Sequence, residues 1–304
     1  MSVNMQVELA GVTLKNPVIL ASGCCGYGRE YDKLYPVERL GGLSVKGTTL
    51  QERQGNPPCR VAETPAGMLN AVGLQNPGVD AFLSRELPWL SQRDTAVIAN
   101  VAGASPEEYW EIAERLGAGA VDMLEVNISC PNVKEGGVAF GVSCASAAAV
   151  VAGMRARTKK PLMVKLSPNV TDIVSIAKSV EDAGADAISL INTLLGMRID
   201  IKTRRPVIRN NTGGLSGPAV FPVAVRMVWQ VASAVKVPVV GMGGIAKWQD
   251  AVEMMMAGAR AVQIGAALFA DPYTPIKVLE GMEQWLAENG IDDVNDIVGT
   301  VKPW

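Results

Sequence analysis

The residues from Glu125 to Asn132 carry the side chains best suited to chemistry in this chain. They read Glu-Val-Asn-Ile-Ser-Cys-Pro-Asn, so that an apolar run ends on Asn127 and a loop then presents Cys130. The chain contains no histidine, which is the usual general base near neutral pH. A cysteine thiolate can act as a base when nearby cations lower its pKa. Cys130 is therefore the candidate acid/base residue, and the alternative is that it is a small buried or loop side chain.

Composition excludes several other classes of protein. The 304 residues carry a net charge of -2, which gives no general attraction to nucleic acid or to an anionic membrane. The five cysteines include no Cys-x-x-Cys pair, so that no zinc or iron–sulfur site is expected and no metal is assigned. Reduced thiols indicate a cytoplasmic protein. The N-terminus does not resemble a signal peptide, and no apolar run approaches the ~18 residues that span a bilayer.

Short apolar runs bounded by turn residues predict eight strands. They cover residues 17–21, 42–46, 95–99, 123–128, 162–165, 187–191, 237–241 and 261–264. Segments with helical spacing of apolar residues lie between them, for example at 172–183, 220–235 and 248–256. An Ala-Gly-Ala junction at 118–120, 183–185 and 257–259 closes a helix before a strand. The pattern predicts an α/β fold, a single (β/α)8 TIM barrel over residues 1–304, with an open doubly wound sheet as the alternative.

A polar residue or a glycine stands at the end of each predicted strand. These residues are Ser22, Lys46, Asn100, Asn127, Lys165, Asn192, Gly243, Gly244 and Gly265. In such barrels the active site lies at the carboxyl ends of the strands, and the last two strands commonly bind a phosphate. Glycines there let backbone N–H groups approach an oxyanion. The two lysines favour an anionic ligand, although lysines that reach solvent and asparagines that cap turns are the alternatives.

Two stretches rich in glycine, proline and asparagine interrupt the repeat. Residues 48–88 and 192–216 are predicted to be insertions at the C-terminal face of the barrel, with small extra strands. The second insertion carries the basic residues Arg198, Lys202, Arg204, Arg205 and Arg209. These charges form either a solvated face or a contact surface for an acidic partner.

Four motifs resemble those of the dihydroorotate dehydrogenase family. They are Asn-Ile-Ser-Cys-Pro-Asn at 127–132, Asn-Ala-Val-Gly-Leu-Gln-Asn-Pro-Gly at 70–78, Gly-Leu-Ser-Gly at 214–217 and Gly-Gly-Ile at 243–245. The resemblance extends from Val7 to the C-terminus, in the family's order. A cysteine at position 130 resembles the class 1 enzymes. Residues 133–137 resemble class 1B, the NAD-linked catalytic subunit, and the fumarate-reducing class 1A homodimer is the alternative.

The resemblance implies an FMN-dependent oxidation of (S)-dihydroorotate to orotate in pyrimidine (UMP) biosynthesis. Cys130 would take a proton from C5 of the substrate, a hydride would leave C6 for the flavin, and Lys165 would stabilise the anionic reduced ring. The implied cofactor-binding residues are Ser22, Lys46, Gly47, Asn100, Asn127, Lys165, Ile191, Gly217, Gly243, Gly244, Gly265 and Ala266. The implied substrate-binding residues are Lys46, Asn70, Ala71, Val72, Gly73, Leu74, Asn127, Asn192 and Thr193.

Class 1B also implies partners. The resemblance to class 1B implies that electrons pass from FMN to NAD through a second subunit that carries FAD and a 2Fe-2S cluster. This chain itself has neither a cysteine cluster nor a dinucleotide fingerprint. A hetero-tetramer built on a homodimer of catalytic chains is expected. Two other classes of function remain open: a Schiff-base lyase or aldolase that uses Lys165, and a barrel that binds a small molecule without catalysis.

Overall fold

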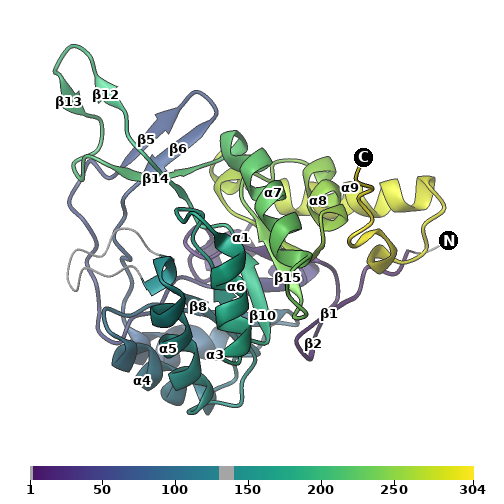
Figure 1. The fold of residues 1–304 in the computed structure, drawn as a ribbon, viewed down its shortest axis with the longest axis horizontal. Coiled ribbons are helices and arrows are strands. Elements are labelled where there is room, and N and C mark those ends of the chain that lie inside the picture. The colour runs from purple at the N-terminus through teal and green to yellow at the C-terminus, as the bar shows by residue number, and fades with distance from the viewer. Residues whose placement is uncertain (1–2, 130–139) are drawn as a thin grey trace.

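A closed barrel of parallel strands forms the centre of the computed structural model, which describes residues 3–129 and 140–304 (Figure 1). In ring order the strands are β3 (Val18–Leu20), β4 (Gly42–Ser44), β7 (Ala96–Val101), β8 (Met123–Asn127), β9 (Leu162–Lys165), β10 (Ala187–Leu190), β15 (Val239–Met242) and β16 (Ala259–Ile264). β16 pairs with β3 and closes the ring, and each neighbouring pair is parallel. The predicted (β/α)8 barrel is confirmed, and the open doubly wound sheet is wrong.

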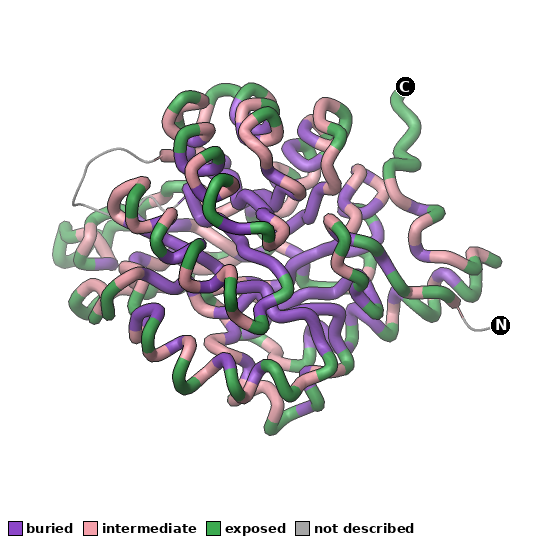
Figure 2. The backbone as a smooth tube through the Cα atoms, turned by 90° about the horizontal axis from the view of Figure 1, so that it is seen from below, coloured by how far each residue is buried: buried purple, intermediate pink, exposed green. Residues whose placement is uncertain are grey.

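Helices cover the outside of the barrel. The longer helices are α4 (Pro106–Gly117), α5 (Cys144–Arg155), α6 (Ile173–Asp182), α7 (Phe221–Ala232), α8 (Trp248–Met256) and α9 (Thr274–Glu288). Shorter elements are α1 (Arg29–Asp32), α2 (Val79–Ala81), a π-helical turn at Phe82–Glu86, α3 (Leu87–Leu90), and 3-10 helices at Val37–Arg39, Phe140–Val142, Pro218–Val220, Ala266–Phe269 and Val294–Ile297. Buried backbone lies along the inner strands, and exposed backbone lies mainly on the outer helices (Figure 2).

Helix α6 illustrates how the outer segments are specified. Asp172 caps the helix by accepting hydrogen bonds from the backbone N–H groups of Val174 and Ser175, at 3.0 and 3.1 Å. The buried residues are Ile173, Ile176, Ala177 and Val180. Their spacing of i, i+3, i+4 and i+7 places them on one face, which packs onto the barrel, while the other face remains in solvent.

The Ala-Gly-Ala junctions end their helices as predicted. Ala118, Ala183 and Ala257 are the C-caps of α4, α6 and α8. Gly184 and Gly258 adopt φ angles of +101° and +116°, in the left-handed region that favours glycine. The repeated sequence therefore encodes a repeated turn from the outer helix back into the barrel.

The two insertions meet in one antiparallel sheet at the carboxyl ends of the barrel strands (Figure 1). In order, its strands are β11 (Leu194–Gly196), β14 (Gly213–Ser216), β6 (Gly67–Asn70) and β5 (Val61–Thr64). A hairpin of β12 (Ile199–Asp200) and β13 (Arg205–Pro206) extends from this sheet. The predicted insertions and extra strands are confirmed with one correction. The first insertion ends before residue 79, because residues 79–90 form the helical segment that precedes β7.

Strand boundaries differ from the predictions in ways that affect the site. β4 ends at Ser44, so that Lys46 lies two residues beyond the strand, whereas β7 continues to Val101 and includes Asn100. At the opposite end of the barrel the chain begins with a hairpin of β1 (Val7–Leu9) and β2 (Val12–Leu14). Over residues 3–129 and 140–304, no helix has the length and apolar character needed to cross a membrane.

Candidate active site

A buried carboxylate lies inside the barrel, two residues before the end of β8. Glu125 is fully buried, and each of its oxygens accepts two hydrogen bonds from other strands. Oε2 accepts from the Ser44 hydroxyl and the Asn100 amide, both at 2.6 Å. Oε1 accepts from the Ser189 hydroxyl and the Gln263 amide, both at 2.8 Å. The carboxylate therefore connects β8 to β4, β7, β10 and β16.

Four of these residues form one layer of the barrel interior, which we call the Glu125 layer. Its members are Ser44, Glu125, Ser189 and Gln263, from β4, β8, β10 and β16. These are alternate strands of the ring. TIM barrels fill their interior with such four-residue layers, usually of branched apolar side chains. This layer is polar instead, and one member can carry a charge.

The electrostatics of the barrel keep that charge. Burial alone would raise the pKa of Glu125, but the positive charge of Lys165 and the hydrogen bonds from Ser44, Gln263 and Asn100 together outweigh burial. They hold the pKa of the carboxyl below its usual value, so that it is ionised at neutral pH. The interior thus holds an anion beneath the predicted site.

Lys165 is the last residue of β9 and lies in register with Asn127, the last residue of β8. It is only 5% exposed. Within the described part of the chain, no hydrogen bond or ion pair holds its ammonium group directly. A buried cation without a direct partner is costly, so that this position is suited to an anionic or electron-rich ligand.

Asn127 and Asn192 are linked through Ser129. Asn192 Nδ2 donates to Ser129 Oγ at 2.7 Å, and the Ser129 hydroxyl donates to Asn127 Oδ1 at 2.8 Å. The backbone N–H of Thr193 donates to Asn192 Oδ1 at 2.8 Å. This chain of hydrogen bonds fixes two predicted amides at the ends of β8 and β10.

Asn100 presents an unsatisfied acceptor. Its Nδ2 donates to Glu125, whereas its Oδ1 has no partner among the described residues although the side chain is fully buried. Oδ1 lies next to Gly47, where an added Cβ would come within 2.9 Å of it. A buried acceptor without a donor is unfavourable, so that a ligand donor fits here. The Ser22 hydroxyl donates to the Val45 carbonyl at 2.6 Å and joins the ends of β3 and β4.

Backbone lines the other part of the predicted cofactor site. Gly243 and Gly244, directly after β15, have φ angles of +120° and +81°. A Cβ on Gly244 would lie 2.8 Å from the backbone nitrogen of Phe221 and 2.9 Å from the carbonyl oxygen of Gly217. The chain therefore passes immediately beside the N-terminus of α7. Free N–H groups and the helix dipole at such a terminus favour an anion.

Three further predicted cofactor residues lie at the same strand ends. A Cβ on Gly243 would come within 3.1 Å of Ile191, which follows β10. Gly265 follows β16, and a Cβ there would lie 3.3 Å from both the Ala21 methyl group and the Cys24 sulfur. Ala266 opens the next 3-10 helix. The structure thus brings the predicted glycines to neighbouring strand ends.

The predicted substrate loop, residues 70–74, is held by two asparagines that sequence reasoning missed. Asn56 Nδ2 donates to the Ala71 carbonyl at 2.9 Å, and Asn76 Nδ2 donates to the Leu74 carbonyl at 2.7 Å. Asn76 is buried and also contacts Thr49. A polar side chain that forms several hydrogen bonds to the backbone holds a loop in one conformation.

The loop also joins the two insertions. Asn70 ends β6 and pairs with Gly214 of β14. A Cβ on Gly214 would overlap the Thr193 side chain, so that these three residues are in close contact. Within the loop, Val72 O accepts from the backbone of Asn56, and Gly73 has a φ angle of +77°. Cys130 lies outside the described residues.

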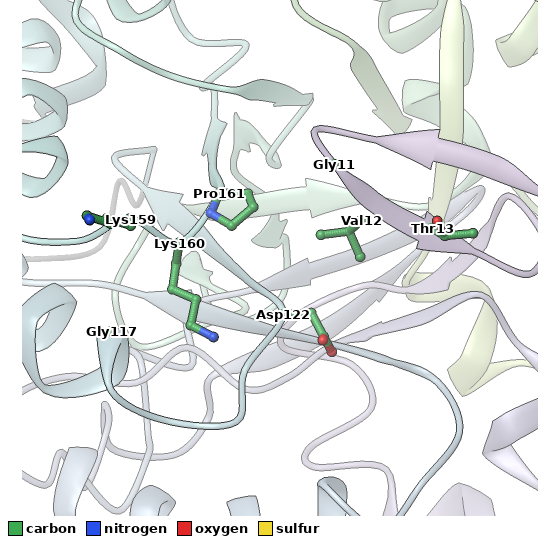
Figure 3. A pocket seen from close by; sticks show the side chains of 8 residues that line it. All are labelled: Gly11, Val12, Thr13, Gly117, Asp122, Lys159, Lys160 and Pro161. Atoms are coloured by element: carbon green, nitrogen blue, oxygen red, sulfur yellow. The ribbon is translucent and has the colours of Figure 1, made fainter.

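A cavity of about 610 Å³ opens at the opposite end of the barrel (Figure 3). Its lining residues are Gly11, Val12, Thr13, Gly117, Asp122, Lys159, Lys160 and Pro161. Asp122 precedes β8 and Pro161 precedes β9, so that the cavity lies at the amino ends of the strands. Active sites of TIM barrels lie at the other end, where the predicted site residues gather.

Sequence reasoning missed the Glu125 layer, although a signal for it was present. Ser44, Glu125, Ser189 and Gln263 each stand between two apolar residues within a predicted strand. A polar residue at an inward position of several barrel strands indicates a shared interior network. Only the ring order shows that the four residues meet.

Comparisons with known proteins agree with this architecture. The sequence profile described as dihydroorotate dehydrogenase matches residues 4–286. Proteins named dihydroorotate dehydrogenase B (NAD(+)), catalytic subunit, are similar along nearly the whole chain. That of Trichlorobacter lovleyi is 56% identical over 98% of this chain and 98% of its own length. That of Lachnoclostridium phytofermentans is 55% identical over 98% and 100%.

The solved structure of a dihydroorotate dehydrogenase from Eimeria tenella, in complex with ferulenol, has a similar fold. Its TM-score is 0.83, with 22% identity, over 98% of this chain and 88% of that one. The fold is that of a TIM barrel with a polar carboxyl end, and the family profile and the similar proteins identify the class as oxidoreductase. The chain belongs to the dihydroorotate dehydrogenase family.

Proposed function

We propose that this chain is the catalytic subunit of an NAD-linked dihydroorotate dehydrogenase, which oxidises (S)-dihydroorotate to orotate in pyrimidine biosynthesis. The observation that carries the proposal is its 52–56% identity, over nearly its full length, to proteins named as that subunit. The chemistry of the strand ends is consistent with it. We also propose a cytoplasmic location; within residues 3–129 and 140–304, the thiols of Cys24, Cys25, Cys59 and Cys144 are free.

FMN is the cofactor that we assign to the carboxyl end of the barrel. Three features support it: an Asn100 acceptor without a partner in the part of the chain that the structure describes, a buried cation on Lys165, and glycine backbone beside the N-terminus of α7. FMN bound here would supply the acceptor for the hydride that leaves C6 of the substrate. Lys165 would stabilise negative charge on the reduced ring.

The phosphate of FMN would bind the backbone of the glycine-lined part of the site. The residues assigned to it are Gly217, Gly243, Gly244, Gly265 and Ala266. Ser22, Lys46, Gly47, Asn100, Asn127, Lys165 and Ile191 would contact the remainder of the cofactor. This division follows the chemistry of the two parts, because backbone N–H groups suit a phosphate and side-chain amides suit a ring edge.

The substrate would be held between the 70–74 loop and the Asn127–Ser129–Asn192 chain. Lys46 supplies a cation for its carboxylate, while Asn70, Asn127, Asn192 and Thr193 supply donors and acceptors. Cys130 takes the proton from C5. Cations at the strand ends would favour its thiolate form. The absence of histidine from the sequence leaves this thiol as the best-placed base near neutral pH.

A second subunit with FAD and a 2Fe-2S cluster would carry electrons from FMN to NAD. We propose that it contacts the β12–β13 hairpin of a catalytic homodimer, within a hetero-tetramer. Every second side chain from Leu195 to Ile201 is exposed and apolar, and Ile201 is 88% exposed. Basic residues flank this edge. Apolar side chains within a polar, charged rim are typical of protein interfaces.

The experiment is purification of the chain with its partner from the native source. We expect a yellow protein whose dihydroorotate-dependent turnover reduces NAD and does not reduce fumarate. Fumarate reduction by the chain alone would instead indicate the class 1A homodimer. Colourless protein with a borohydride-trapped substrate adduct on Lys165 would indicate a Schiff-base enzyme. Colourless protein without turnover would leave a binding barrel.

A further inference from the structure

The Glu125 layer calls for an explanation beyond barrel packing. An ionised carboxylate loses its hydration when it is buried, and hydrogen bonds and charges only partly replace it. Branched apolar residues would fill the same layer without this cost. The layer directly adjoins the proposed cofactor site, because Asn100 donates to Glu125 and Lys165 acts on it from β9. A functional role would account for the polar residues.

We propose that Glu125 is a positioning residue of the cofactor site, which balances the charge of Lys165 and turns the Asn100 amide so that its oxygen faces the ligand. This inference rests on the proposed function, because it concerns a bound flavin. It adds a residue that would touch neither the flavin nor the substrate.

The first part of the inference concerns charge. Lys165 interacts electrostatically with Glu125 on β8 and with Cys24 after β3. Burial raises the pKa of the Cys24 thiol, despite the nearby charges of Lys165 and Lys46, so that the thiol is neutral. Lys46 adds a second cation at the same end of the barrel. Glu125 is therefore the anion that balances Lys165.

The second part concerns the direction of an amide. Each carboxylate oxygen of Glu125 takes one hydroxyl and one amide donor. A carboxylate accepts only, so that Asn100 must offer Nδ2 to it and keep Oδ1 for the side of Gly47. A glutamine at position 125 would place an NH2 group against one of the two amides. That amide, on Asn100 or Gln263, would have to turn over.

The main test is the midpoint potential of bound FMN, measured against a reference dye over a pH series. We compare the wild type with Glu125→Gln. In the variant the positive charge of Lys165 is no longer balanced by Glu125, so that the potential should lie above that of the wild type across the series.

Two controls separate charge from packing. Glu125→Asp keeps the charge, and Ser189→Ala removes one hydrogen bond and keeps the charge. Both variants should follow the wild-type curve of potential against pH. Superposition of the Glu125→Gln curve on the wild-type curve would overturn the proposal, and so would a displaced curve in Ser189→Ala.

A second test does not depend on the flavin. Urea unfolding of the full chain without added FMN is measured for Glu125→Gln, Lys165→Met and the double variant. The double variant should lose less free energy of unfolding than the sum of the single losses, because each single change leaves a buried charge uncompensated. Additive losses would contradict the charge balance.

The double variant also covers the case in which Glu125→Gln does not fold. It contains neither buried charge, so that it should fold whenever Lys165→Met folds, and the opposite result contradicts the inference. If the wild type binds no FMN, the proposed function fails. The unfolding cycle would still report whether Glu125 and Lys165 are coupled.

Discussion

The carboxyl end of the barrel consists of two parts that present different chemistry. From β4 to β10 the strand ends present side chains, namely Lys46, Asn100, Asn127, Lys165 and Asn192. At β15 and β16 they present backbone through Gly243, Gly244 and Gly265, beside the N-terminus of α7. Side chains distinguish ligands by charge and by the direction of hydrogen bonds, whereas backbone at a helix terminus accepts a phosphate of any parent molecule. The comparison predicts that the first part controls the reaction and the second controls cofactor retention.

The largest expected effect is in the backbone part. Gly244→Ala places a Cβ 2.7 Å from the Phe221 Cβ, at a φ angle of +81°. Overlap and backbone strain should lower the free energy of unfolding by about 2–4 kcal/mol and release the flavin. Urea unfolding and the visible spectrum measure both. Gly290→Ala is the control, because Gly290 has a φ angle of +68° and open space around it; it should keep its flavin.

The next effect is in the chemical step. Cys130→Ser should keep the yellow flavin, and its turnover at neutral pH should fall by a factor of about 10²–10⁴. A serine hydroxyl is a far weaker acid than a thiol, so that it is not deprotonated to a base at this pH. The remaining activity should rise with pH. Steady-state assays between pH 6 and 10 check this. Cys59→Ser, which replaces an exposed thiol, is the control. Full activity in Cys130→Ser would remove the thiol from the mechanism.

The third change tests the cation. Lys165→Met should lower kcat by about 10²–10³, since it removes a charge that stabilises the reduced ring. The flavin should remain bound if the backbone part governs retention. Flavin content and anaerobic reduction by dihydroorotate measure the two effects separately. Lys178→Met, on the exposed face of α6, is the matched control and should behave as the wild type.

The smallest effect concerns the hydrogen-bond chain. Asn192→Ala removes the proposed substrate contact together with the bond to Ser129, and should raise KM for dihydroorotate about tenfold. Ser129→Ala removes only the bond, so that its KM should rise less. Equal KM values for both variants and the wild type would mean that this chain does not orient the substrate.

Most of the fold could be predicted because its signals are local. The apolar runs at 17–21 and 162–165 and the junctions at 183–185 and 257–259 depend only on neighbouring residues. The residue types at strand ends then indicated the polar end of the barrel. Motif resemblance supplied the roles of residues 70–74, which spacing alone could not give.

The Glu125 layer could not be predicted in the same way. Ser44, Ser189 and Gln263 are separated from Glu125 by 81, 64 and 138 positions, and they meet only because alternate strands face one axis. The hydrogen bonds from Asn56 and Asn76 to the 70–74 loop could not be predicted either. An asparagine in a loop has many possible backbone partners, and only the folded chain selects one.

The pairing of β6 with β14 has a consequence for how this protein can vary. Asn70 and Gly214 lie 144 positions apart in the sequence, yet they are paired on neighbouring strands of one small sheet. Shortening either insertion alone would leave the backbone N–H and C=O groups of the other strand unpaired, and it would expose the carboxyl end of the barrel to solvent. The two insertions should therefore change length together or not at all, because their backbones are paired in one sheet.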